Sequence, residues 1–259
     1  MSFFEHLEEL RWHILRASVA VLVAGVTIFI YRDVVFDSII LAPFFPEFPM
    51  NKLLCGIDPS VCFAAPNAEF QSISPYEQFT GAMSFAAVGG LVVTFPYILW
   101  EFWRFIRPGL QPAERKRLTG TVAVMSALFF IGVAFAYFVL TPFSIGFLAN
   151  FQISSKVHNQ WKIGTVVSLV TQLTVAGGLL FEFPVLAYYL GKIGILTTAF
   201  MREYRRHAYV ALIFVAAIIT PPDVLSQILI FIPLVMLYEV SIAVCGIAVR
   251  RREREMAAI

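Results

Sequence analysis

The sequence has few charged residues, and this scarcity limits what the chain can be. Only 14% of its 259 residues are charged, whereas 59% are hydrophobic. Typical soluble domains have about 25% charged residues. The hydrophobic residues form long runs without charge, which is the pattern of a chain that crosses a membrane several times. The net charge is only +2, so the composition indicates no nucleic-acid partner.

Sequence motifs of common enzymes are also missing. There is no phosphate-binding Gly-x-x-x-x-Gly-Lys, no Gly-x-Gly-x-x-Gly, no His-Glu-x-x-His and no Gly-x-Ser-x-Gly. The four histidines and three cysteines show no spacing typical of a metal site. We therefore expect no enzymatic reaction, no catalytic residues, no metal and no cofactor.

The first residues lack the basic segment that opens a secretory signal, since Glu5, Glu8 and Glu9 make them acidic. The first apolar run is therefore expected to be a retained span. Residues 2–14 predict an amphipathic helix, in which Ser2 and Glu5 have the spacing of a capping box. Glu5 and Glu9 lie four residues apart, and neither has Lys or Arg four residues later. Either they suit the helix dipole, or they leave a carboxylate ridge open to an external cation.

Six apolar runs predict a single all-α polytopic membrane domain over residues 1–259. The predicted spans are about 15–31, 79–100, 118–140, 165–190, 208–219 and 224–238. The last two are short, because crossing the hydrocarbon core takes about 20 residues. A re-entrant hairpin is the alternative for this pair. The Pro-Pro-Asp sequence at 221–223 favours an aqueous turn, and therefore two spans.

The distribution of Lys and Arg predicts the orientation. Fifteen of them lie in the N-terminal segment, in 101–117, in 192–206 and in the tail, while four lie in the intervening loops. The positive-inside rule then places both termini in the cytoplasm. Residues 32–77, 141–164 and 220–223 become loops on the opposite side. Repeated prolines in 32–77 predict short, irregular helices there.

Glu182 is the most informative residue within a predicted span. Inserting an ionisable side chain there costs about 2.5–3.5 kcal/mol, so a function is the default hypothesis. The alternative is a structural glutamate that is protonated or hydrogen-bonded, with Thr171 and Thr174 available as polar neighbours on the same span.

Six motifs in order resemble the TatC family, the core of the twin-arginine protein translocase. The first three are His-Leu-Glu-Glu-Leu-Arg at 6–11, Phe-Trp-Arg-Phe-Ile-Arg-Pro-Gly-Leu at 102–110 and Glu-Arg-Lys-Arg at 114–117. The others are Phe-Ala-Tyr-Phe at 135–138, Phe-Glu-Phe-Pro at 181–184 and Thr-Pro-Pro-Asp-Val-Leu-Ser-Gln at 220–227. The resemblance covers nearly the whole chain. The sequence departs from the pattern at His13, where a basic residue often follows the Leu-Arg pair.

The resemblance implies a receptor and scaffold in the bacterial inner membrane. It would bind Arg-Arg signal peptides and export folded proteins with the proton-motive force. Its partners would be small single-span Tat subunits of the TatA/TatB type, further copies of itself and membrane lipid. The alternative is a proton-coupled small-solute transporter that uses Glu182. Such transporters often contain inverted repeats. The weak sign of a repeat in this sequence is one proline in each of the second, fourth and sixth predicted spans.

The resemblance also assigns roles to residues. Glu182 matches the family's intramembrane glutamate, which faces a concave groove. The signal-binding positions would be Glu9, Glu114, Phe105 and Leu110. Positions required in the exported-side loops would be Pro43 and Asp223, and positions that dock small partners would be Tyr137 and Gln227.

Two cysteines lie in the loop 32–77, on the predicted exported side. Disulfides persist on that side of a bacterial inner membrane, so we predict that Cys55 and Cys62 are bonded. This loop is longer than is usual in the family, which makes its cap distinctive.

Overall fold

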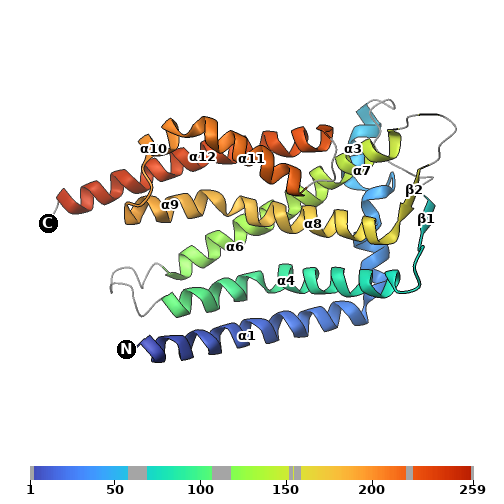
Figure 1. The fold of residues 1–259 in the computed structure, drawn as a ribbon, viewed down its shortest axis with the longest axis horizontal. Coiled ribbons are helices and arrows are strands. Elements are labelled where there is room, and N and C mark those ends of the chain that lie inside the picture. Colours follow the sequence, from blue (N-terminus) through green and yellow to red (C-terminus); the bar gives the residue numbers. More distant parts are fainter. Residues whose placement is uncertain are drawn as a thin grey trace.

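The computed structural model describes residues 3–57, 69–106, 118–151, 154, 159–219 and 224–257. Long helices lie side by side, and both termini are at one end of the bundle (Figure 1). Short helices and two short strands cover the other end (Figure 1). The predicted helical, polytopic fold class is confirmed. In the described part of the chain, five helical segments are long and apolar enough to cross a membrane: Glu8–Ile30, Glu77–Ile106, Gly120–Asn150, Ile163–Ile193 and Gln227–Arg254.

The first two long helices pack against each other along their length. Helix α1 (Phe3–Ile30) is continuous, so the predicted amphipathic start and first span form one helix. It lies against α4 (Glu77–Ile106). The two backbones approach closely at Gly90, where an added Cβ would lie 2.8 Å from Val21 O and from Gly25 N. Only glycine fits this contact.

The third long segment continues beyond its predicted end. Helix α6 (Leu118–Phe135) passes through a π-helical turn, η5 (Ala136–Leu140), into α7 (Thr141–Asn150). The predicted end of this span at about residue 140 is wrong, because the helical segment continues to Asn150. The π turn shifts the hydrogen bonds by one residue, so that the Thr141 N–H donates to Ala136 O and Pro142 falls in the first turn of α7. Proline lacks a backbone N–H, and it is tolerated there because the N–H groups of a first helical turn have no acceptor within the helix.

The fourth long segment breaks at Glu182. Helix α8 (Ile163–Phe181) ends there and α9 (Phe183–Ile193) begins, with Pro184 in its first turn. Gly194 ends α9 with a φ of 89°, a left-handed conformation that favours glycine.

The chain then forms α10 (Thr198–Glu203), α11 (Arg205–Ile219) and α12 (Val224–Ala257). With 15 residues, α11 spans only about 22 Å, at about 1.5 Å per residue. The prediction that the last helix is also short is wrong, because α12 has 34 residues. Glu239, near the predicted end, does not stop the helix. Its carboxylate accepts hydrogen bonds from Arg205 Nη2 and the Tyr209 hydroxyl on α11, both at 2.7 Å.

Short elements cap the end of the bundle opposite the termini. They are α2 (Arg32–Val35), η1 (Phe36–Ile40), η2 (Ala42–Phe44) and α3 (Pro49–Ile57), in agreement with the predicted irregular helices. Two short strands that the sequence did not predict, β1 (Glu69–Gln71) and β2 (Gln160–Lys162), pair in parallel. Phe44 packs edge-on against Phe70 and Trp161 of the two strands, at ring-centroid distances of 5.1 and 4.9 Å.

Glu77 ties this cap to the bundle. It is 5% exposed, and its carboxylate accepts the N–H groups of Gly164 at 2.8 Å and Ile73 at 3.1 Å. Lys162 Nζ lies 3.9 Å away. The start of α4, the start of α8 and strand β2 are therefore fixed by one carboxylate.

Candidate functional site

A polar cluster joins α1 to α4 near the end of the bundle that holds the termini. His13 of α1 hydrogen-bonds through Nδ1 to the Glu101 carboxylate of α4. Glu101 is only 2% exposed. Arg104 lies 3.5 Å from its second oxygen, and the Tyr97 hydroxyl also hydrogen-bonds to it. His13, the position at which the sequence departs from the expected pattern, thus has a hydrogen-bond partner on the neighbouring helix.

Glu9 lies one helical turn before His13. Glu9, Trp12, His13, Arg16 and Arg104 line an open pocket of about 430 Å³. Glu9 is half-buried, and within the described residues its carboxylate has no ion pair and no hydrogen bond. The pocket therefore contains a carboxylate that is available to an external cation.

Phe105 is the second predicted site residue that the structure brings to this pocket. Its ring contacts the His13 ring edge-on, with 6.2 Å between centroids. Glu114 and Leu110 lie outside the described residues, so their placement stays a prediction. Sequence reasoning missed Glu101. The available signal was a carboxylate placed between the aromatic residues Trp100 and Phe102.

An apolar groove adjoins the polar pocket along the same two helices. This α1–α4 groove has a volume of about 790 Å³ and is lined by Ile14, Ala17, Val21, Leu22, Met83 and neighbouring apolar residues. Val19 and Leu22 of α1 are 52% and 65% exposed, as expected for side chains that face lipid. The polar pocket and the apolar groove are thus successive features of one helix pair.

Glu182 lies at the break between α8 and α9. Its two carboxylate oxygens are buried and have no hydrogen-bond partner within the described part of the chain. Thr171 and Thr174 do not supply one, because their hydroxyls donate to Val167 O and Val170 O of their own helix. The hypothesis of a glutamate satisfied by these threonines is therefore wrong. An unsatisfied buried carboxylate is costly, which strengthens the case for a function.

The remaining predicted residues lie in or near the cap. Pro43 is buried, and its carbonyl accepts a hydrogen bond from Asn51 Nδ2 at 3.0 Å. The Tyr137 hydroxyl donates to Ile39 O at 2.8 Å, and Gln227 Nε2 donates to Ile213 O at 3.2 Å. These three residues therefore have structural contacts of their own, and their predicted roles are untested. Asp223 lies outside the described residues.

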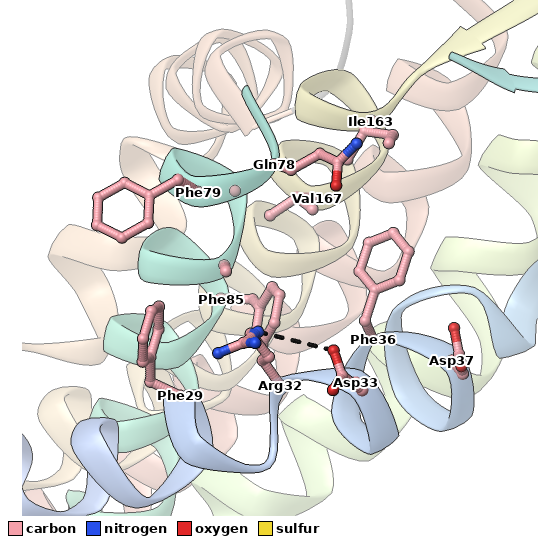
Figure 2. Close-up of a pocket in the computed structure, with 12 residues that line it drawn as sticks. Phe29, Arg32, Asp33, Phe36, Asp37, Gln78, Phe79, Phe85, Ile163 and Val167 are labelled. Carbon is pink, nitrogen blue, oxygen red and sulfur yellow. Dashed lines mark ion pairs between the residues drawn. The ribbon is translucent and has the colours of Figure 1, made fainter. Parts of the chain in front are cut away.

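An open pocket of about 540 Å³ lies next to the cap, between the end of α1 and the starts of α4 and α8. Figure 2 shows Arg32 and Asp33 facing each other there, beside Phe29 and Phe85. The Arg32 guanidinium lies 5.7 Å from the centre of the Phe29 ring. Cys55, in α3, is disulfide-bonded. Cys62 lies outside the described residues, so the pairing of Cys55 with Cys62 stays a prediction.

Comparison with known proteins identifies the family. The model of the family described as Sec-independent protein translocase protein (TatC) matches residues 5–233. The chain belongs to the TatC family. TatC of Blattabacterium sp. subsp. Periplaneta americana is 36% identical over 249 residues, which cover 93% of this chain and 94% of that protein. TatCy of Bacillus subtilis is 34% identical over 258 residues, with 100% and 94% covered.

A solved TatC structure supports the same assignment. The crystal structure described as Twin Arginine Translocase Receptor- TatC superposes with a TM-score of 0.76 at 30% identity, and 94% of this chain and 99% of that chain are covered. The chain is therefore a multi-pass inner-membrane subunit of the Tat protein translocase. TatC membership also decides against the small-solute transporter alternative.

Proposed function

We propose that this TatC-family chain is the receptor that binds Arg-Arg signal peptides of folded precursors. The observation that carries the proposal is the half-buried Glu9 carboxylate, which has no partner among the described residues and faces a pocket beside Phe105. Carboxylates suit this task because arginine presents a planar fork that binds them bidentately, whereas lysine is a point charge. A hydrogen bond of this kind contributes about 1.5–3 kcal/mol.

The cations around the pocket are compatible with this role. Arg104 is held at 3.5 Å by Glu101, so part of its charge is compensated. Arg16 also lines the pocket and would compete with the signal for Glu9. Short-range contacts decide the outcome, since charges beyond a Debye length of about 8 Å are screened. We propose that Glu114 accepts the second signal arginine, with Leu110 in the same site.

The apolar segment of the signal would bind along the α1–α4 groove. The first residue that lines the groove, Ile14, lies between His13 and Arg16 of the polar pocket, so the two sites adjoin along α1. A peptide whose arginines meet Glu9 would therefore present its following apolar residues to apolar walls. Burial of apolar surface, at about 25 cal/mol per Å², then adds affinity that the charged contacts alone do not supply.

Export would be driven by the proton-motive force, which supplies about 2.3 kcal/mol per unit charge per 100 mV. Glu182 would support transport from the helix break. Small single-span Tat subunits would dock near Tyr137 and Gln227, and several copies of the chain would assemble. Pro43 and Asp223 would maintain the exported-side loops.

The proposal is tested by crosslinking the full chain in membranes to a precursor with an Arg-Arg signal. The Glu9→Ala variant is compared with Glu8→Ala, because Glu8 is the adjacent, exposed acid. We expect Glu9→Ala to lower the crosslinking yield several-fold and Glu8→Ala to leave it unchanged. Equal yields from both variants would reject Glu9 as a signal-binding residue.

A further inference from the structure

The open pocket next to the cap has both charged and aromatic walls (Figure 2). We call it the interface pocket, because it lies where one candidate membrane span ends, at Ile30, and where two others begin, at Glu77 and Ile163. Its volume is about 540 Å³, and its polar lining consists of Arg32, Asp33, Asp37 and Gln78. A ligand in this pocket would lie partly at the membrane boundary and partly within the apolar layer.

The apolar part of the lining extends inward from that boundary. Phe85 of α4 is 4% exposed and lies about two helical turns after Glu77, which is about 12 Å at about 1.5 Å per residue. Phe79, nearer the boundary, contacts Phe29 of α1 edge-on, with 6.1 Å between ring centroids. Phe29 and Phe79 also line the α1–α4 groove, so they form the border between the groove and the pocket.

Arg32 offers most of its hydrogen-bond donors to a ligand. Its guanidinium lies 5.7 Å from the centre of the Phe29 ring, a cation–π contact that orients it. Its Nε lies 3.6 Å from Asp33 Oδ1, which is too long for a hydrogen bond. Within the described residues the guanidinium has no other ion pair or hydrogen bond. A guanidinium with free N–H groups suits a phosphate, which it can bind in a bidentate manner.

Two carboxylates accompany this cation. The Asp33 side chain is 87% exposed, and Asp37, one helical turn further, is also exposed. Asp37 has no ion pair and no hydrogen bond with any described residue. Figure 2 shows the neutral Gln78 amide on the wall opposite Arg32. The lining therefore has one cation and two anions, which complements a ligand that carries a negative and a positive group.

Further charged side chains adjoin the pocket, and none of them supplies a second free cation. Glu77 is buried and accepts two backbone N–H groups. Lys162 Nζ lies 3.9 Å from the Glu77 carboxylate, so these two charges compensate each other. Glu47 lines an adjoining pocket that shares Asp37 with this one, and it adds a carboxylate on that side. A purely anionic ligand would therefore meet an excess of carboxylates.

We propose that the interface pocket binds a zwitterionic phospholipid with an ammonium headgroup, of the phosphatidylethanolamine type. The phosphate would lie at Arg32, the ammonium at Asp33 and Asp37, and an acyl chain along Phe79 and Phe85. Aromatic residues and an arginine at the level where spans end are typical of the membrane interface. The proposal does not depend on the signal-binding assignment, because the pocket that contains Glu9 shares no lining residue with this one.

The test measures lipids retained by the purified full chain, with native mass spectrometry. The two probes are phosphatidylethanolamine and phosphatidylglycerol, which share the phosphate and differ in the ammonium group. The acid variant combines Asp33→Asn with Asp37→Asn. Its matched control combines Glu47→Gln with Glu69→Gln, which removes two exposed acids of the cap that do not line the pocket.

We expect the parent to retain phosphatidylethanolamine roughly five-fold more strongly than phosphatidylglycerol, which corresponds to about 1 kcal/mol, the contribution of one exposed ion pair. The acid variant should lose this preference, and its control should keep it. Equal retention of the two lipids by the parent, or an unchanged preference in the acid variant, would overturn the proposal.

Arg32→Gln tests the other half of the headgroup. It should lower the retention of both lipids roughly five-fold, because both carry the phosphate. Lys52→Gln removes an exposed cation of α3 that does not line the pocket, and it should bind both lipids as the parent does. Parental retention by Arg32→Gln would overturn the proposal. So would an acid variant that keeps the lipid preference and loses crosslinking to an Arg-Arg precursor, since the pocket would then hold a peptide.

Discussion

The buried Glu101 carboxylate of α4 is hydrogen-bonded to the His13 ring of α1, and the two residues are 88 positions apart in the chain. This contact joins the two helices beside the pocket that contains Glu9. Truncating one partner of a buried hydrogen bond typically costs about 1–3 kcal/mol, because the other partner remains buried and unsatisfied. We therefore expect Glu101→Ala to lower the thermal unfolding midpoint of the purified chain clearly.

The double variant His13→Leu with Glu101→Leu provides the control for that prediction. Replacing both partners of a buried pair with apolar residues is often close to neutral. The double variant should therefore unfold at a higher temperature than Glu101→Ala. If Glu101→Ala has the same thermal unfolding midpoint as the parent, the pair does not stabilise the contact between α1 and α4.

A substitution at Gly90 should disrupt the same helix pair by another mechanism. Gly90→Val places a Cβ 2.8 Å from backbone atoms of α1, which cannot move as the end of a side chain can. Overpacking of this kind typically costs about 1–3 kcal/mol. The control is Gly120→Ala, at an open helical position, which should be neutral or slightly stabilising. The unfolding temperatures of both variants are measured in detergent. If Gly90→Val unfolds at the same temperature as Gly120→Ala, the close contact between α1 and α4 does not contribute to stability.

Glu182 should be required for transport and not for folding. Glu182→Gln removes the charge and should preserve the fold, because a neutral amide is less costly within the membrane than a carboxylate. Glu182→Ala should weaken export. Thr174→Ala is the matched control, because the Thr174 hydroxyl bonds only within its own helix in the described structure, and it should export normally. Parental export by Glu182→Ala would mean that the carboxylate has no part in transport.

The predicted Cys55–Cys62 disulfide can be tested by counting thiols. The chain has three cysteines, and Cys245 is free and buried. After denaturation without reductant, an alkylating reagent should modify one thiol, and after reduction it should modify three. Modification of three thiols without reductant would show that the bond is absent.

The sequence predicted the fold class because apolar runs and basic loops directly encode insertion into a membrane. It did not predict where the helices end. Pro142 looks like a terminator, but the π turn before it removes the conflict. Glu239 looks like a boundary, but Arg205 and Tyr209, more than 25 residues earlier, satisfy it within the helix. Both outcomes depend on local geometry or distant partners that a linear pattern does not contain.

The candidate site was predicted only in part for the same reason. Glu9 and Phe105 follow from the family resemblance, and the structure brings them together around His13. Glu101 and Glu77 were missed, because their importance comes from contacts with α1 and with the start of α8. The β1–β2 pair joins two three-residue strands about 90 positions apart, and segments this short carry no recognisable alternation.

The central claim is that the carboxylates of Glu9, near the start of α1, and of Glu114 recognise paired arginines. The most direct measurement is the affinity of the full chain for an Arg-Arg signal and for a Lys-Lys signal, in the parent and in Glu9→Ala combined with Glu114→Ala. We predict that the parent binds the Arg-Arg signal at least ten-fold more tightly, since one charged hydrogen bond contributes about 1.5–3 kcal/mol. The double variant should lose this preference. A double variant that still prefers Arg-Arg as strongly as the parent would contradict the account.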